Sequence, residues 1–493
     1  MNRFIITLLM LALSGPLQLA AKDYNASLFG IKSNGTTLNT TAIQKAIDYI
    51  HENGGGQLVF FVGRYLTGSL ELKSNVTIHL KEGAILVGST NIYDYNIESP
   101  WNALVYALKA DSIGITGKGV IDGQGREVAY NLIDQVHKGI LHDEMKLDRP
   151  AKRRPKAICF RECTNVNISG ILIKNAADWV QLYDQCENLV IDGITVDSKA
   201  FWNNDGLDVV DCRNVKITNS FFDASDDAIC FKSHDATKMC ENVEVRNCVA
   251  RSSANGIKFG TVSSGGYRNF KIINNKVYDT FRSAITIATP DGGLVENILV
   301  DSLNAYNTGN AIFLRIGARW NKGRTGSMNN ITIQNLYAEI PAGKPDAGYE
   351  YEGPVEDLPR NLSPAAIVGL PGQDITGVTL KNIQIVYGAG GNPNYACRGI
   401  RPADLDSIPE MAASYPEFSQ FKELPAWGFY VRHAKDLTLE HVTLTVKSPD
   451  YRPAIVLDDV KGATFINVKY QEPGRGKKQL HTYRSSGITK KEY

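Results

Sequence analysis

The stretch Cys163-Thr164-Asn165-Val166-Asn167-Ile168 decides the fold, because near-copies of it follow along the chain. Three copies keep both the cysteine and the asparagine: Cys186-Glu187-Asn188-Leu189-Val190-Ile191, Cys212-Arg213-Asn214-Val215-Lys216-Ile217 and Cys240-Glu241-Asn242-Val243-Glu244-Val245. Weaker copies keep the asparagine alone, as Asn269, Asn297 and Asn330. The seven asparagines are 23 to 33 residues apart, and self-similarity at such a period is typical of stacked-repeat folds.

Each unit contains short runs in which β-branched and polar residues alternate, such as Val215-Lys216-Ile217-Thr218. Alternation predicts strands with one buried face, and the intervening Gly, Asn and Asp residues predict turns. Several short strands per unit favour an all-β fold, a right-handed single-stranded parallel β-helix (a solenoid). Asparagines at one turn of every coil are expected to stack and to satisfy polar groups between coils, so we interpret this ladder as structural.

The bulk properties agree with a solenoid. The chain has 493 residues, of which 43% are hydrophobic and 21% charged, with a net charge of +1. Length alone would suggest about three domains, but a solenoid grows by adding coils to one continuous core, and we therefore expect one catalytic β-helix domain over residues 22–470. The near-zero charge argues against a nucleic-acid partner. The basic segment 471–493 is interpreted as a solvated C-terminal tail.

Residues 1–21 combine a basic start, an apolar run from Phe4 to Leu13 and small residues near Ala21. This pattern predicts a cleaved signal peptide and a secreted or periplasmic protein. No later stretch is apolar enough to predict a membrane span. The eight cysteines are expected to be mostly buried free thiols, and no Cys–His spacing predicts a zinc site. We expect no metal and no other cofactor, while the oligomeric state stays open.

Two acidic turns carry the candidate chemistry: Asn203-Asn204-Asp205-Gly206-Leu207-Asp208 and Ser225-Asp226-Asp227-Ala228-Ile229. They fall at about the same phase of successive repeats, so stacking is expected to bring Asp205, Asp226 and Asp227 onto one face. Clustered carboxylates repel one another, and one of them then holds its proton near neutrality. A protonated and an ionised carboxyl group are the acid and base that glycoside hydrolysis requires.

At these residues the chain resembles glycoside hydrolase family 28, the polygalacturonase and rhamnogalacturonase family. The resemblance covers most of the chain and includes the stretch from Gly117 to Gly125. It implies that the helix expected near residues 39–47 caps the open N-terminal end of the β-helix. It further implies that Asp226 is the general acid, that Asp205 and Asp227 activate water, and that the anomeric configuration is inverted.

The chain departs from the family pattern beside these aspartates. Polygalacturonases carry Gly-His-Gly where this chain has Ala254-Asn255-Gly256, and Arg and Lys where it has Thr286 and Ala288. In the family, those basic residues hold the carboxylate of galacturonate. Rhamnogalacturonases also lack the histidine. The departure therefore weakens the prediction of plain polygalacturonase activity, but it does not weaken the prediction of glycoside hydrolysis.

Other substrate-binding candidates follow from strand alternation and from Asn255. If Ile229, Ile257 and their equivalents point inward, then Lys232, Lys258 and Arg315 point outward. We hypothesise that Lys258 and Arg315 replace the missing carboxylate clamp. The alternative for each is a solvated basic residue, and for Arg315 this alternative is the favoured one. Trp202 is a candidate for stacking on a sugar, and His234 is a candidate for a sugar contact or simply a surface histidine.

Two stretches lack the repeat, near residues 343–364 and 391–427. Long loops in a compact repeat are usually functional or disordered, and we interpret these as cleft walls that favour exo-action. The leading prediction is an exported inverting hydrolase acting on pectic poly- or oligosaccharides of the galacturonate or rhamnogalacturonan type. The alternatives are a β-helix polysaccharide lyase or epimerase, with Lys258 as a possible proton abstractor, and a non-catalytic carbohydrate-binding β-helix.

Overall fold

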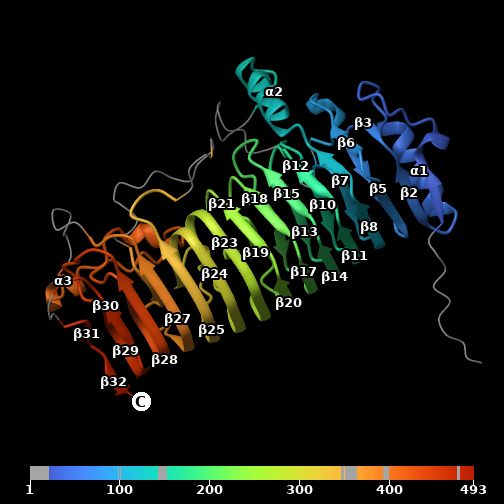
Figure 1. Ribbon diagram of the computed structural model, residues 1–493. Coiled ribbons are helices and arrows are strands. Elements are labelled where there is room, and N and C mark those ends of the chain that lie inside the picture. The colour runs from blue at the N-terminus through green and yellow to red at the C-terminus, as the bar shows by residue number, and fades with distance from the viewer. Residues whose placement is uncertain are drawn as a thin grey trace, which may run out of the picture.

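The structure is a computed structural model, and it describes residues 22–97, 99, 102–142, 153–345, 349, 363–391, 399–474 and 478–492. These residues form a long parallel β-helix, with α1 at the N-terminal end and the C-terminus at the other (Figure 1). Three strand stacks run along the helix, and each strand pairs in parallel with its counterpart one coil away. The predicted fold class is therefore confirmed.

The first stack, here called the site sheet, carries the acidic turns. Its separate strands are β4 (Leu70–Glu71), β7 (Ala103–Leu108), β10 (Lys156–Arg161), β13 (Gln181–Asp184), β16 (Asp208–Val210), β19 (Ile229–Ser233), β22 (Ile257–Ser263), β26 (Ala365–Val368) and β31 (Leu480–Tyr483).

The second stack, here called the ladder sheet, contains the repeated Asn stretch. Its strands are β1 (Asp23–Asn25), β2 (Gly56–Phe60), β5 (Val76–Leu80), β8 (Asp111–Gly117), β11 (Thr164–Ser169), β14 (Glu187–Asp192), β17 (Arg213–Thr218), β20 (Cys240–Arg246) and β32 (Ser486–Lys491).

The third stack closes each coil with β3 (Gly63–Thr67), β6 (Ala84–Gly88), β9 (Val120–Asp122), β12 (Leu172–Lys174), β15 (Thr195–Ser198), β18 (Phe221–Ala224), β21 (Val249–Ser252) and β30 (Lys469–Gln471). Later strands are long enough to belong to more than one stack: β23 (Gly266–Thr289), β24 (Leu294–Ile316), β25 (Ser327–Ile340), β27 (Ile375–Tyr387), β28 (Phe429–Val446) and β29 (Ile455–Ile466).

The predicted asparagine ladder is present. All seven asparagines have φ between 53° and 59°, a left-handed conformation that Asn tolerates better than most residues. From Asn188 onward, each Nδ2 donates to the Oδ1 of the ladder asparagine one coil earlier, at 2.7–3.2 Å, and Asn165 Nδ2 donates to Asp111 Oδ1 at 2.8 Å. A second ladder, which we did not predict, links Asn219, Asn247 and Asn274 at 3.1 and 2.7 Å. The ladders hold successive coils in register.

One hydrophobic core runs through the coils and includes the inward residues expected from alternation, Leu207, Ile229, Ile257, Ile285 and Ile312. The expected capping helix is α1 (Thr40–Glu52), which buries Ile43 and Ile47 against the first coil. The other helices among the described residues are η1 (Ala26–Phe29), η2 (Ile92–Asp94), α2 (Gly125–His137), α3 (Pro402–Asp406) and η5 (Phe418–Phe421).

The C-terminal segment corrects one prediction. Residues 471–493 were expected to be a solvated tail, but β31 and β32 lie within this segment and pair with β29 as a last coil. The physical reason is local: Leu480 is buried in the core and Ile488 packs against it, so the basic residues around them flank two apolar anchors.

Three other expectations concern cysteines and membranes. Seven cysteines are buried and free, and Cys397 lies outside the described residues. The sulfur of Cys212 accepts a hydrogen bond from the backbone N of Cys186 at 3.2 Å, which shows the stacked arrangement. The predicted signal peptide, residues 1–21, also lies outside the described residues. Within them, helices are too short or too polar to cross a bilayer.

Residues 399–427, here called the covering loop, pack on the outer face of the site sheet. Leu405, Phe418 and Phe421 of this loop form a second hydrophobic cluster with Phe313 and Tyr430. Phe313 packs against the covering loop and not in the main core, and it is fully buried there. The loop that we predicted at 391–427 is therefore an ordered wall of the molecule over its described part.

Candidate active site

The site sheet brings the two acidic turns side by side. Asp205 lies three residues before the first residue of β16, and Asp226 and Asp227 lie just before β19. Backbone bonds join the turns, since Gly206 N donates to Asp227 O at 2.9 Å. A Cβ at Gly206 would lie 2.6 Å from Ala228 O, so glycine permits this close approach.

The three predicted catalytic aspartates are largely shielded from solvent. Asp205 and Asp227 are buried and Asp226 is partly exposed. A carboxylate oxygen of Asp205, one of Asp227 and the Sγ of Cys230 all lie within 4.8 Å of one another. These three atoms could ligate a metal ion, but each of the two carboxylates already pairs with a lysine. The protein itself therefore supplies positive charge to this cluster.

Lys232 serves the first turn. Its ammonium lies 3.1 Å from Asp205 Oδ2 and also contacts Asp208 Oδ1. The same ammonium stands 4.3 Å from the centre of the Trp179 ring. Burial raises the pKa of Asp205 well above its usual range, with Lys232 opposing and nearby carboxylates adding to the rise. Burial likewise raises the pKa of Asp208 to about 6.

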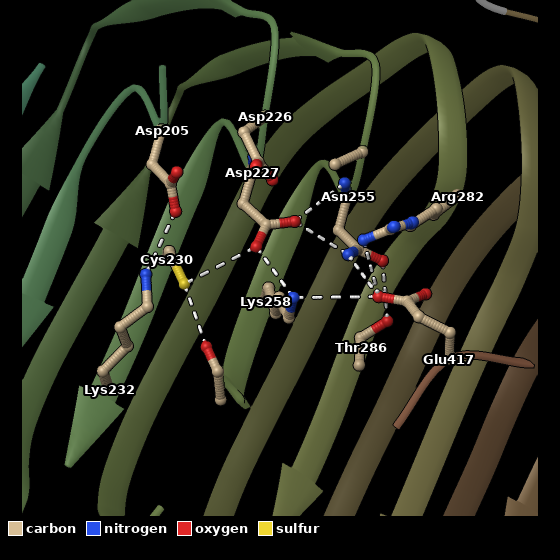
Figure 2. A network of polar contacts seen from close by, with 12 residues as sticks. Asp205, Asp226, Asp227, Cys230, Lys232, Asn255, Lys258, Arg282, Thr286 and Glu417 are labelled. Carbon is tan, nitrogen blue, oxygen red and sulfur yellow. Dashed lines mark hydrogen bonds and ion pairs between the residues drawn. The ribbon is translucent and has the colours of Figure 1, made fainter. Parts of the chain in front are cut away.

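Lys258 serves the second turn. Its ammonium lies 2.8 Å from Asp227 Oδ2, while Asn255 donates to Asp227 Oδ1 from its backbone N at 3.0 Å and from Nδ2 at 2.8 Å (Figure 2). Burial acts to raise the pKa of Asp227, but Lys258, Arg282 and Lys232 outweigh it and hold that pKa at about 2.

The neighbouring Asp226 shifts in the opposite direction. Burial and the charge of Asp227 raise its pKa, against the influence of Arg282 and Lys258. Adjacent residues in one turn therefore differ in protonation: Asp227 is ionised over a wide pH range, and Asp226 keeps its proton more readily. Such a pair can donate and accept protons in a single reaction.

The covering loop adds residues that the sequence analysis did not single out. Glu417 Oε1 accepts hydrogen bonds from Asn255 Nδ2 and from Arg282 Nη1, both at 3.1 Å, and lies 3.7 Å from Lys258 Nζ (Figure 2). Lys258 Nζ also donates to Tyr415 Oη at 2.8 Å. Glu417 is 162 residues from Asn255 and belongs to no repeat, so the only signal in the sequence was the break in the ladder.

The predicted substrate-binding residues separate into two groups. Lys232, Lys258 and Asn255 lie in the network of the aspartates. Arg315 is buried elsewhere, where its guanidinium donates to the carbonyls of Gly369 at 3.1 Å and Glu410 at 2.5 Å. Arg315 therefore anchors the covering loop to the site sheet.

The two remaining candidates are not part of this network as it is drawn in Figure 2. Trp202 is half-buried, packs against Ala129 and Phe201, and accepts a hydrogen bond at its carbonyl from Arg154 at 2.6 Å. The side chain of His234 is exposed, and its backbone N donates to Asp211 at 2.9 Å. Their proposed sugar contacts stay predictions.

A shallow hollow of about 560 Å³ lies on a different face, along the asparagine ladder. Its lining includes Asn188, Lys216, Asn242, Glu244 and Lys271. It shows no adjacent carboxyl groups with opposed pKa shifts, whereas the turn at Asp226 and Asp227 does. We therefore place the candidate active site at the acidic turns.

Comparison with known proteins gives a family match over the coils that hold this site. Residues 59–293 match the model described as glycosyl hydrolases family 28. The exo-poly-alpha-D-galacturonosidase of Dickeya chrysanthemi is 25% identical over 478 residues, covering 86% of this chain and 75% of that protein.

Two solved structures are also similar. The family 28 exopolygalacturonase of Yersinia enterocolitica is 21% identical, with 95% of this chain and 78% of that chain covered and a TM-score of 0.60. At this identity the likeness concerns the fold. A protein of Parabacteroides merdae is 39% identical over 46% of this chain and 95% of its own, with a TM-score of 0.41.

Proposed function

The chain belongs to glycoside hydrolase family 28, and on that basis we propose that it hydrolyses glycosidic bonds of pectic poly- or oligosaccharides with inversion. The observation that carries the mechanism is that Lys258 and Asn255 bind Asp227, the neighbour of Asp226 in one turn, so that the pKa of Asp227 is lowered while that of Asp226 is raised. Asp226 is the general acid in this proposal. Asp227 is the main base, and Asp205 helps to hold the attacking water.

The proposed reaction follows from this division of roles. The carboxyl group of Asp226 gives its proton to the glycosidic oxygen while the bond from that oxygen to the anomeric carbon breaks. Water attacks the anomeric carbon from the opposite face and passes its proton to the Asp227 carboxylate. Asp205 Oδ1 has no hydrogen-bond partner among the described residues, so it is available to accept a hydrogen bond from this water.

The electrostatics of Lys258 argue against the lyase alternative. A lysine that abstracts a proton must be neutral near the working pH. Burial acts to lower the pKa of Lys258, but Asp227, Tyr415 and Glu417 raise it well above its usual range. The ammonium therefore stays charged, which suits a role in holding Asp227 ionised.

The substrate class is supported by relatives named for polygalacturonan. These are the Dickeya enzyme and a probable polygalacturonase of Vitis vinifera, which is 25% identical over 448 residues. The covering loop packs on the outer face of the site sheet and supports exo-action. A wall that closes one end of a cleft stops a long polysaccharide from lying across it, so that only chain ends enter. Export to the periplasm or the medium rests on the signal-peptide pattern of residues 1–21.

Product analysis tests this proposal. Polygalacturonan, rhamnogalacturonan and their oligosaccharides should yield new reducing ends with no absorbance at about 235 nm, because hydrolysis forms no double bond, and proton NMR of fresh products should show the inverted anomer first. An unsaturated product would identify a lyase. Early accumulation of the retained anomer would exclude the proposed mechanism, and the absence of any product from these substrates would contradict pectic hydrolysis.

A further inference from the structure

One carboxylate in the active-site network has no part in the proposed reaction. Glu417 comes from the covering loop, next to η5, and only 2% of its surface is exposed. In Figure 2 its carboxylate points toward Lys258, Arg282 and Asn255 on the neighbouring coils. A buried carboxylate is costly unless donors surround it, so its position calls for a function.

The donors around Glu417 form a site for a carboxylate. Asn255 Nδ2 and Arg282 Nη1 each lie 3.1 Å from Oε1, and Lys258 Nζ lies 3.7 Å away. These groups come from two successive coils of the site sheet, next to Asp227. A guanidinium, an ammonium and an amide that converge beside a glycosidic-bond centre would suit the carboxylate of an acidic sugar, but the protein has placed its own carboxylate there.

The second oxygen of Glu417 strengthens this reading. Oε2 is buried and has no hydrogen-bond partner among the described residues. An acceptor in that position favours a donor from a ligand, such as a sugar hydroxyl. An ionised sugar carboxylate brings no donor and would place a second negative charge beside the first.

We propose that Glu417 determines substrate specificity by occupying the carboxylate-binding position over β22 and β23, so that the sugar bound there is neutral or esterified. This inference rests on the proposed function and names the substrate class for that subsite. It also revises the clamp hypothesis: the ammonium of Lys258 is already shared by Asp227 and Glu417, and an acidic sugar could use it only in place of Glu417.

Kinetics on paired substrates test the inference. The probes are an oligogalacturonide, the same oligogalacturonide as its methyl ester, and an oligosaccharide that alternates galacturonate with rhamnose. The wild-type enzyme should prefer the esterified or alternating substrate. Glu417→Gln removes the charge and keeps the shape, so the ratio of kcat/KM for acidic over esterified substrate should rise about 10- to 100-fold, mainly through KM.

Two variants serve as controls. Glu417→Asp keeps the charge and should keep the wild-type preference. Glu410→Gln changes a carboxylate of the same loop that pairs with Arg432 and His433, and it should leave the ratio unchanged. Binding of the oligogalacturonide to the Asp226→Asn protein, measured by calorimetry with and without Glu417→Gln, gives a readout that does not depend on turnover.

The outcomes separate the two proposals. Tighter oligogalacturonide binding and a higher ratio in Glu417→Gln alone support the inference. An unchanged or lower ratio in a folded Glu417→Gln protein, or an equal change in Glu417→Asp, overturns the inference while hydrolysis stands. If the wild-type enzyme hydrolyses none of the three probes, the proposed function fails and the inference fails with it.

Discussion

Lys232 and Lys258 lie on neighbouring strands, and each lies between two carboxylates. The pKa of the aspartate that each lysine contacts is nevertheless shifted in opposite directions. Lys232 contacts Asp205 and Asp208, both from the preceding coil. Lys258 contacts Asp227 from the preceding coil and Glu417 from a loop far along the chain. The pKa of Asp205 lies well above its usual range, whereas that of Asp227 is about 2.

The two aspartates differ in pKa because different charged groups and hydrogen-bond donors surround them. Asp205 is buried with Lys232 as its main cation, and that cation is shared with Asp208. Asp227 has Lys258, the further charges of Arg282 and Lys232, and two N–H donors from Asn255. Protonation in this site therefore follows the number of cations that face each carboxylate and the number of carboxylates that compete for them, and hydrogen bonds to the charged form add to the effect.

The largest expected effects come from removing the aspartates. Asp226→Asn and Asp227→Asn should each lower kcat by about 10² to 10⁴-fold, the usual range for a lost general acid or base. Asp205→Asn should cost less than Asp227→Asn, since Asp227 is the ionised partner. Asp184→Asn, a buried aspartate of the same sheet that pairs with Arg161, is the matched control. Near-wild-type turnover in all three site variants, with circular dichroism showing folded protein, would refute the assignment.

Removing each lysine in turn should show that Lys258 controls the protonation of Asp227 more strongly than Lys232 does. Lys258→Met takes away the main charge that keeps Asp227 ionised, so the acidic limb of the kcat/KM profile should move upward by about 1 to 3 pH units. Lys232→Met should move it less. Because Lys258 is buried in an ion pair, its loss should also lower the free energy of unfolding by about 3 to 5 kcal/mol in urea denaturation. Equal shifts of the limb in both variants would contradict the comparison.

The free energy of unfolding should fall as the pH is lowered, because Asp227 becomes protonated. Its pKa falls from 3.8 to about 2 on folding, so it contributes stability that is present above pH 3.8 and lost as pH falls through about 2. The contribution is about 2 kcal/mol. Urea denaturation between about pH 5 and pH 2 should show this loss, and Asp227→Asn should flatten it. A variant with the wild-type slope would show that other groups govern acid unfolding.

The smallest effect is expected in the ladder, far from the lysines. Asn242→Ala loses the hydrogen bonds to Asn214 and from Asn269 and places Ala at φ 58°. The free energy of unfolding should fall by about 1 to 2 kcal/mol with activity unchanged. Asn242→Gly tolerates the same φ and isolates the hydrogen bonds. A large loss of activity in either variant would mean that the ladder face takes part in function.

The sequence predicted the part of the active site that the coils themselves contribute. The phase of Asp205, Asp226 and Asp227 in the repeat predicted that they would meet on one face, and they do. Alternation correctly predicted that Lys232 and Lys258 point outward. It did not predict that Lys258 is buried, because the covering loop that buries it has no period to read. Arg315 was misjudged for the same reason, since its partners lie in that loop and the adjoining strand.

The sequence by itself determined the β-helix, the asparagine ladder and the position of the aspartates, because each depends on contacts between coils about one repeat apart. Only the tertiary structure decided that Glu417 and Tyr415 meet Lys258 and that Arg282 joins them. Glu417 and Asn255 are 162 residues apart, and folding of the loop onto the sheet depends on the apolar cluster of Phe418, Phe421 and Phe313. Periodic contacts can be read from spacing, whereas a contact made once, between a loop and a distant coil, depends on the packing of the whole fold.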